Sequence, residues 1–361
     1  MRKSVSLVLL VILSLTVLAT AAHCQSVCKP PAQALLLKME RQQWQALAAV
    51  CAVPAFCGRG TATPLVFCDG TGTNPVAIPH DTLDVKALGG NAAAASAAIA
   101  RRYWRKAPTV FVVDSYEQAL WVVPSAAFLQ SPILVSPDAG ILRALGATKA
   151  VVVGRAKPQV AEVVKLDDKT AVWKYQLSVL GGTPRACNYI VMTNPHDTDD
   201  QLNPNVQWPY LSLAAAPLAA YRRAIVQTAD YTGDRALIHA LGVSLGDAGD
   251  KVKYATLKPT FQKVKDDSYA AERFLFDAGM PPEYLAMVGG SVELPHYVID
   301  LHTKYTYWNM AIDYVPADTP YACMRDDVDY TRFVQPDLAV GRLMGDTLED
   351  VTLQLQKTFF Y

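Results

Sequence analysis

Aspartates crowd the stretch between residues 313 and 337, and carboxylates at this density are typical of a cation site. Calcium takes roughly six to eight oxygen ligands, and closely spaced carboxylates on a loop can supply several of them. The spacing does not fit an EF-hand, which needs a central Gly and a terminal Glu. The sequence therefore predicts calcium as the candidate cofactor, with a solvated acidic turn as the alternative. The proposed ligands are Asp318, Asp326, Asp327, Asp329 and Asp337.

His296 and Cys323 invite comparison with a cysteine–histidine pair, in which an imidazole activates a thiolate. His296 follows Leu294-Pro295 and has no flanking glycines, and Cys323 precedes an acidic loop. Nearby carboxylates raise the pKa of a thiol and make it less reactive. We therefore do not interpret the pair as catalytic, and no catalytic residue is assigned within the chain.

A second polar segment, residues 196–200, reads His-Asp-Thr-Asp-Asp and follows a predicted strand. Ligands bind beyond the carboxyl ends of parallel strands, so this loop is a candidate for metal or ligand contact. A loop with Asx-type turns is the alternative. The chain has no G-x-G-x-x-G, G-K-[ST] or H-E-x-x-H pattern, which leaves nucleotide-binding and zincin functions unsupported.

Composition indicates a globular protein that does not bind nucleic acid. Apolar residues make up 51% of the chain, enough for a substantial core. Lys and Arg total 33, as do Asp and Glu, so the basic excess of a nucleic-acid binder is missing.

The N-terminus has the layout of a secretory signal peptide over residues 1–22. Arg2 and Lys3 precede an apolar run over 5–18, and small residues follow it. An uncleaved anchor and a lipoprotein are the alternatives. No other run reaches the roughly 20 apolar residues of a membrane span, so we expect a secreted, cell-surface or periplasmic protein without a span after cleavage.

Five of the seven cysteines lie within the first 68 residues. In an exported chain this clustering favours local disulfides, with free thiols as the alternative. Cys51 and Cys57 could close a short loop around Pro54. Zinc is disfavoured because paired C-x-x-C spacings are missing.

From residue 108 onwards, short apolar strands alternate with helical stretches, a pattern typical of parallel sheets with crossover helices. Residues 23–95 are interrupted by Gly and Pro and are predicted to be irregular, apart from one helix over Gln33–Val50. The remaining predicted helices are 91–106, 116–129, 140–145, 211–223, 269–278 and 347–360, and the predicted strands are 109–113, 132–135, 150–154, 189–192, 224–226, 284–290 and 336–342.

Two stretches resemble known families. Residues 108–155, with Thr-Val-Phe-Val-Val, Ser-Pro-Ile-Leu-Val-Ser and Leu-Gly-Ala-Thr-Lys-Ala-Val-Val-Val-Gly, resemble one copy of the type 2 cell wall-binding repeat. Two departures from that family are Gln118 in place of Asp and Arg155 in place of the second Gly of a pair. This resemblance implies an α/β unit and contact with cell-wall polymer.

Residues 187–361 resemble the gingipain-like cysteine peptidases. The likeness is carried by Tyr-Leu-Ala-Met-Val-Gly-Gly from residue 284, Ala-Asp-Thr-Pro-Tyr-Ala from 317 and Pro-Asp-Leu-Ala-Val-Gly-Arg from 336. In that family a His in a Gly-His-Gly loop and a Cys after the next strand follow later. Neither pattern occurs here, so the resemblance implies a gingipain-like region truncated before its catalytic centre.

We therefore expect an α/β protein with two open, mostly parallel-sheet units (flavodoxin/caspase-like) after a small Cys-containing N-terminal segment. The predicted parts are a signal peptide (1–22), the irregular segment (23–95), the repeat-like unit (96–185) and the gingipain-like region (186–361). The predicted function is that of the exported, non-catalytic part of a cysteine peptidase acting on peptide or protein substrates. The alternative is a cell-surface or cell wall-binding module without activity.

Overall fold

The fold was analysed in a computed structural model of the chain. The residues that it describes are 27–28, 35–40, 42–58, 61–62, 65–68, 81–183, 185–198, 210–231, 248–290, 293–300, 306–307, 310–311, 314–325, 328–330, 334–345 and 348–360. The predicted signal peptide lies outside them and stays a prediction.

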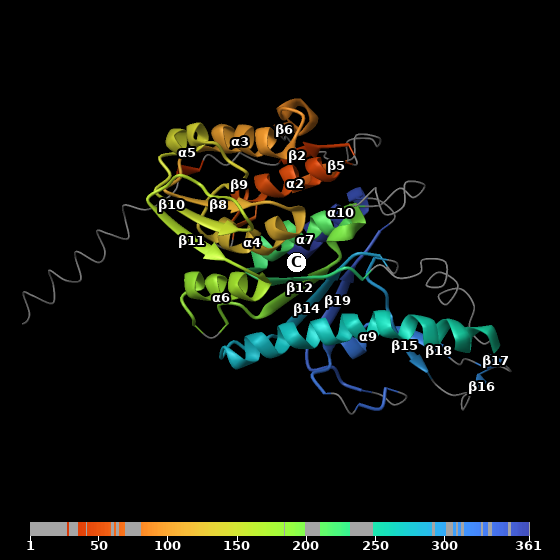
Figure 1. The fold of residues 1–361 in the computed structure, drawn as a ribbon. Coiled ribbons are helices and arrows are strands. Elements are labelled where there is room, and N and C mark those ends of the chain that lie inside the picture. The colour runs from red at the N-terminus through yellow and green to blue at the C-terminus, as the bar shows by residue number, and fades with distance from the viewer. Residues whose placement is uncertain are drawn as a thin grey trace, which may run out of the picture.

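Three parallel sheets form the framework, and we call them the N-terminal, middle and C-terminal sheets (Figure 1). The N-terminal sheet has the order β5-β2-β6, the middle sheet β11-β10-β8-β9 and the C-terminal sheet β13-β12-β14-β19. The strands are β2 Leu35–Lys38, β5 Leu65–Cys68, β6 Asp81–Asp84, β8 Thr109–Val113, β9 Ile133–Val135, β10 Lys149–Val153, β11 Glu162–Leu166, β12 Tyr189–Thr193, β13 Ile225–Thr228, β14 Tyr284–Val288 and β19 Ala339–Leu343. The α/β fold class predicted from the sequence is confirmed.

Helices cover both faces of the C-terminal sheet. Helices α4, α7 and α10 lie between it and the other two sheets, and α6 and α9 pack on its opposite face (Figure 1). The helices are α2 Gln43–Ala52, α3 Ala92–Tyr103, α4 Tyr116–Phe128, α5 Ala139–Leu145, α6 Lys169–Leu180, α7 Ala215–Arg222, α9 Ala248–Asp277 and α10 Leu348–Phe360.

Besides the three parallel sheets, the described residues form short antiparallel strand pairs and 3-10 turns. The pairs are β1 Val27–Cys28 with β7 Trp104–Lys106, β3 Cys57–Gly58 with β4 Thr61–Ala62, β15 Tyr297–Asp300 with β18 Tyr314–Ala317, and β16 Thr306–Tyr307 with β17 Met310–Ala311. The 3-10 turns are η1 Val53–Ala55, η2 Lys86–Leu88, η3 Pro195–Thr198, η4 Leu211–Ala214 and η5 Thr319–Ala322.

The strands of the C-terminal sheet alternate strictly between two apolar layers. In β12, Ile190 and Met192 pack with α6 and α9, whereas Val191 packs with α4 and α7. In β14 the same alternation separates Leu285 from Ala286. Successive side chains of a strand point to opposite faces, so a sheet covered on both faces needs an unbroken apolar run.

The helix predicted over Gln33–Val50 is wrong in its first half. Residues 35–38 form the central strand β2, and the helix α2 begins only at Gln43. Leu36 and Leu37 are adjacent and both fully buried. A central strand buries neighbouring side chains on opposite faces, whereas a surface helix buries one stripe, so the leucine run fits the strand.

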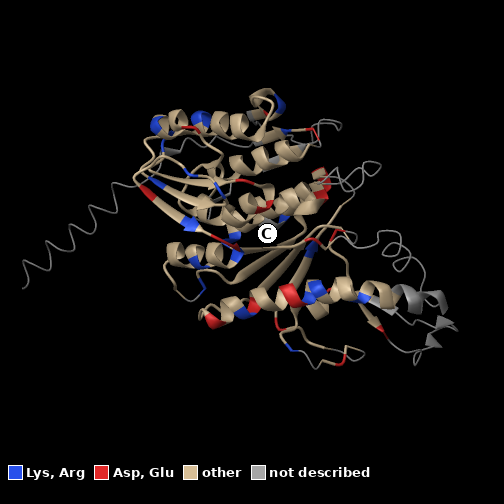
Figure 2. Cartoon of the chain, in the orientation of Figure 1, with Lys and Arg blue, Asp and Glu red and all other residues tan. Residues whose placement is uncertain are grey.

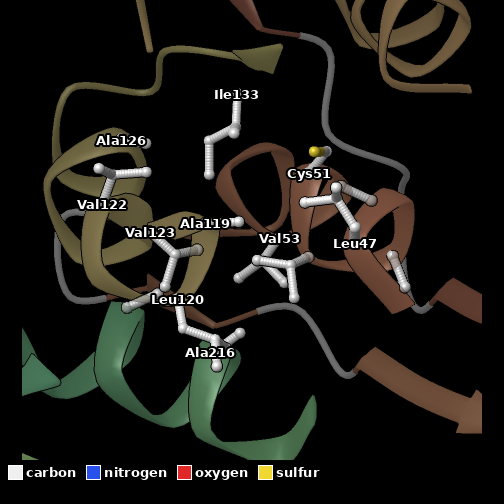
Figure 3. Close-up of a cluster of buried hydrophobic side chains, with 14 of the residues drawn as sticks. Leu47, Cys51, Val53, Ala119, Leu120, Val122, Val123, Ala126, Ile133 and Ala216 are labelled. Carbon is white, nitrogen blue, oxygen red and sulfur yellow. The ribbon is translucent and has the colours of Figure 1, made fainter. Parts of the chain in front are cut away.

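The core between α2, α4 and α7 is built around small residues (Figure 3). Ala216 of α7 is fully buried and faces Leu120 of α4, beside Val53. Helix interfaces this close tolerate no added volume. We expect Ala216→Leu to lower the free energy of unfolding by about 2 kcal/mol through overpacking. Urea denaturation measures it, and Ala98→Leu on the half-buried face of α3 serves as the control with a change below about 0.5 kcal/mol. Equal effects of the two substitutions would contradict this account of the core.

The predicted disulfide between Cys51 and Cys57 is wrong, because both residues are free cysteines. Cys51 lies in α2 (Figure 3) and Cys57 in β3, and each residue is buried in the apolar core, where it acts as a small hydrophobic group. The side chains of Cys24, Cys28 and Cys68 lie outside the described residues.

Burial raises the pKa of the Cys51 thiol far above its ordinary value and that of Cys57 to about 12. Because the thiolate is the reactive form, neither thiol should react in the folded protein. We expect N-ethylmaleimide, without any reductant, to modify both after denaturation and neither before. Peptide mass spectrometry measures the modification. If both cysteines stay unmodified in the denatured protein, the result would contradict free thiols and support a disulfide between Cys51 and Cys57.

Charges of both signs are spread over the described elements (Figure 2). Along α9 they are partly separated, with Lys258, Lys263 and Lys265 before a segment in which acidic residues predominate. Among the described residues, no helix combines the length and apolarity that crossing a membrane requires.

Candidate functional site

The candidate site lies at the carboxyl edge of the C-terminal sheet, where β12, β14 and β19 end. In open parallel sheets this edge binds ligands because the loops that follow the strands converge there. It is formed by the loop after β12, the Gly289-Gly290 turn after β14 and Arg342 near the end of β19. Asp318, which follows β18, comes from outside the sheet.

Arg342 is the centre of this edge, and its side chain is only 5% exposed. Its guanidinium grips the Asp318 carboxylate with two bonds, Nε to Oδ2 at 2.9 Å and Nη2 to Oδ1 at 2.6 Å. Nη1 donates to the carbonyl of Leu294 at 2.6 Å and to that of Gly289 at 3.3 Å. A planar fork of donors suits this combined recognition of a carboxylate and backbone oxygens.

The turn after β14 favours glycine mainly through its backbone conformation. Gly289 has φ of 146°, in the region that favours glycine. A Cβ on Gly290 would come within 2.7 Å of Glu293 Oε2. Gly289 therefore lets the chain turn directly after Tyr284–Val288, in the conformation that presents the Gly289 carbonyl to Arg342.

Asp318 also orients His296, whose Nδ1 lies 2.9 Å from Asp318 Oδ1. Burial raises the pKa of Asp318, but the hydrogen bonds from Arg342 and His296 outweigh burial and hold that pKa well below its ordinary value. The carboxylate is therefore charged at neutral pH. A carboxylate on Nδ1 fixes the orientation of an imidazole, as in many catalytic and metal-binding histidines.

A buried hydrogen-bond network around Asp197 forms the other part of the candidate site. Asp197 is only 1% exposed and accepts a hydrogen bond from the Ser212 backbone N–H at 2.7 Å. The Ser212 hydroxyl donates to the other carboxyl oxygen, and Tyr116 Oη is 2.8 Å from Ser212 Oγ. Tyr116 belongs to α4, so this network joins the middle and C-terminal parts of the chain.

Burial raises the pKa of Asp197 to about 7, in spite of the hydrogen bonds from Ser212 that lower it. Carboxyl groups with pKa values moved towards neutrality are typical of functional sites, although structural networks also produce them. Asp197 therefore changes its charge within the physiological pH range.

Strand β13 ends on a third polar group, centred on Thr228. Trp121 Nε1 donates to Thr228 Oγ1 at 2.5 Å, and Thr228 Oγ1 donates to Glu117 Oε1 at 2.6 Å. Lys169 Nζ donates to the Thr228 carbonyl at 3.2 Å, and burial lowers the pKa of this lysine. Helices α4 and α6 are thereby tied to the same edge of the sheet.

The predicted calcium ligands are only partly described. Asp318 is bound to Arg342, which leaves its two oxygens occupied. Asp337 Oδ2 accepts from the Met324 N–H at 2.8 Å, and Asp329 is exposed. Asp326 and Asp327 lie outside the described residues. No group of three metal-ligating side chains occurs within the part of the chain that the structure describes, and the calcium site stays a prediction.

Cys323 follows η5 and donates through Sγ to the Thr319 carbonyl at 3.3 Å. Burial, with the charge of Asp337, raises the pKa of this thiol. No hydrogen bond joins Cys323 to His296, both of which the structure describes. The arrangement therefore lacks the contact that would make this thiol a nucleophile.

Sequence reasoning identified Asp318 and the loop that contains Asp197, but it missed Arg342 as the centre of the site. It also missed Ser212 and Tyr116. The available signal was the Arg that follows Ala-Val-Gly in a predicted strand, because an arginine side chain that becomes buried needs a partner that neutralises its charge.

Comparison with known proteins places residues 183–361 within the model described as Peptidase family C25. This match covers the C-terminal sheet and its carboxyl edge and supports the resemblance to gingipain-like peptidases. The chain is a gingipain-like, peptidase-related α/β protein over this region. No curated protein and no solved structure matched it. The cell wall-binding repeat expected at 108–155 has no support from these comparisons.

Proposed function

We propose that the chain supplies the non-catalytic α/β part of an exported gingipain-like cysteine peptidase. The observation that carries the proposal is the match of residues 183–361 to Peptidase family C25. The order of a Gly-turn strand, an Asp-Tyr segment and the Ala-Val-Gly-Arg strand agrees with this assignment. The substrates would be peptides or proteins.

The chemistry of the described residues favours a supporting role. A cysteine peptidase needs a thiolate, and the four described cysteines are buried with pKa values raised above the ordinary value. The 361 residues contain no Gly-His-Gly sequence. The proposal therefore requires that the catalytic His and Cys come from sequence outside these residues.

In this role, the carboxyl edge of the C-terminal sheet would form a rigid surface against which the neighbouring catalytic unit packs. Arg342 joins β19 to the turn after β14 and to Asp318, and Asp197 joins the loop after β12 to η4. The reaction rate falls when catalytic groups are displaced by about 1 Å. A surface held by buried ionic and polar bonds is therefore suited to positioning them.

Export is the second part of the proposal and rests on the signal-peptide layout of residues 1–22. The N-terminal sequence of the secreted product tests it, and we expect the mature chain to begin near residue 22 or 23. A product that retains Met1 and stays in the cells would contradict export.

The peptidase assignment is tested by reading the gene beyond codon 361. We expect the frame to continue into a Gly-His-Gly loop followed by a strand that ends in Cys, and intact mass to show the longer product. A stop codon directly after Tyr361 would contradict the proposal, because the chain would then have no catalytic partner within its own gene product.

A further inference from the structure

A pocket of about 600 Å³ opens at the amino edge of the C-terminal sheet, opposite the candidate site. Tyr189 and Tyr284 are the first residues of β12 and β14 and are paired in the sheet. The C-terminal end of α7 supplies Tyr221 and Arg222, and Arg223 follows. Arg185, from the loop before β12, completes the wall.

The charged residues that line this pocket are all basic. Three of its eight lining residues are arginines and three are tyrosines, and none of the eight is acidic. Glu283 is engaged with Asn188 Nδ2 at 2.9 Å and is not part of the lining. Cations at the end of α7 complement its dipole, but Arg185 comes from a separate loop and has no such reason to be there.

Aromatic rings hold the guanidinium groups in place. The Arg222 guanidinium carbon lies 5.8 Å from the Tyr189 ring centroid and 5.3 Å from that of Tyr221. The Tyr189 and Tyr284 rings are stacked, with centroids 5.4 Å apart and planes 19° from parallel. Cation–π contacts of this kind orient a guanidinium group.

Two of the arginines have backbone conformations that ordinary side chains rarely adopt. Arg185 has φ of 72° and Arg223 has φ of 55°. Arg223 takes the position after a helix where Gly is usual, and Gln176 Nε2 fixes it by donating to the carbonyls of Arg223 and Ala224 at 3.0 and 2.9 Å. Strain of this type persists where the surroundings enforce it, and it clusters at ligand clamps.

We propose that this Arg–Tyr pocket, defined by Arg185, Arg222, Arg223, Tyr189, Tyr221 and Tyr284, binds carboxylate side chains of an acidic peptide segment. Guanidinium forks match the two oxygens of a carboxylate. A nucleic acid fits less well, because its backbone needs a basic stripe and the chain has a net charge of zero. The inference does not depend on the proposed peptidase role.

The test is calorimetric titration of the full chain with an acetylated, amidated tetraglutamate peptide at low salt. We expect binding that weakens as salt rises, and no binding of the tetraglutamine analogue. The double variant Arg185→Gln/Arg222→Gln should weaken binding at least ~10-fold, because it removes two charged hydrogen-bonding groups. The matched control Arg101→Gln/Arg105→Gln, at exposed positions of α3 and β7, should bind as the wild type does.

A measurement on the unmodified protein removes any dependence on the folding of the variants. Tetraglutamate should protect Arg185 and Arg222 from phenylglyoxal, and inorganic phosphate should compete only weakly. The proposal is overturned if the wild type does not bind tetraglutamate, if both double variants lose affinity equally, or if phosphate binds and tetraglutamate gives no protection.

Discussion

Arg342→Met is expected to lower the free energy of unfolding by about 4 kcal/mol, because it breaks a buried ion pair from one side. The substitution keeps most of the side-chain length and removes the charge. It leaves Asp318, whose side chain is 17% exposed, without its main partner. It also removes the donor to the Leu294 carbonyl. Urea denaturation followed by circular dichroism measures the change.

Three companion variants make this result specific. Arg342→Lys keeps the charge but not the fork, so it should lose less than Met and more than about 1 kcal/mol. The double variant Asp318→Asn/Arg342→Met should recover part of the loss, since no buried charge is then left unpaired. Arg325→Met breaks two exposed contacts, with Asp337 Oδ2 at 3.7 Å and with the Gln335 carbonyl at 3.4 Å, and should cost less than about 1 kcal/mol. Equal losses for Arg325→Met and Arg342→Met would contradict the assigned role of Arg342.

Asp197 should make the protein less stable as the pH rises from about 4 to 7. Burial raises the pKa of this carboxyl to about 7 in the folded state, while the unfolded chain has the ordinary value. Between those two pH values the folded protein binds the proton and the unfolded chain does not, so unfolding becomes more favourable as pH increases. The contribution is fully lost above the folded pKa and amounts to about 4 kcal/mol.

Asp197→Asn should remove this pH dependence because it mimics the protonated carboxyl group. Its oxygen can accept from the Ser212 N–H, and its amide can donate to Ser212 Oγ, the bonds that a neutral Asp197 would make. Relative to the wild type, the variant should therefore gain stability at pH 8 compared with pH 5. Thermal unfolding at both pH values measures this gain.

An exposed aspartate provides the control. Asp167→Asn, whose side chain is 77% exposed, should leave the pH dependence unchanged. Glu272 titrates in the same direction as Asp197, because burial raises its pKa to about 8, but it is present in both proteins and cancels in the comparison. A difference between wild type and Asp197→Asn that is the same at pH 5 and pH 8 would contradict the assigned ionisation of Asp197.

The sequence predicted β12 and β14, the two inner strands of the C-terminal sheet, well because most of their residues are buried. Tyr284–Val288 was found from a continuous apolar run that ends at a Gly pair. Leu35–Lys38 was misassigned because the periodicity of a short apolar run does not by itself distinguish a central strand from a buried helical segment; the burial of both Leu36 and Leu37 does. The edge strand Glu162–Leu166 was missed because most of its residues are at least partly exposed, which gives neither an apolar run nor a clean alternation.

The candidate site could not be predicted from local sequence patterns, because its residues are far apart in the chain and meet only in the folded protein. Tyr116 and Ser212 are 96 residues apart in the chain, and Asp318 and Arg342 are 24 apart on different elements. Only the folded sheet places the end of β19 against the turn after β14. The dense aspartates predicted a cation, whereas a buried arginine holds Asp318, because a carboxylate in an apolar setting is stabilised by either kind of positive charge.

The central proposal, that the described site supports catalysis without performing it, is tested most directly with a thiol-reactive active-site probe. The purified full chain is incubated at neutral pH with an epoxysuccinyl or chloromethyl ketone peptide and with fluorogenic peptide substrates, and modified cysteines are mapped by mass spectrometry. We expect no hydrolysis and no modification of Cys323 in the folded protein, since burial raises the pKa of its thiol. Rapid modification of Cys323 together with hydrolysis, both lost in His296→Ala, would contradict the account and make this pair a catalytic centre.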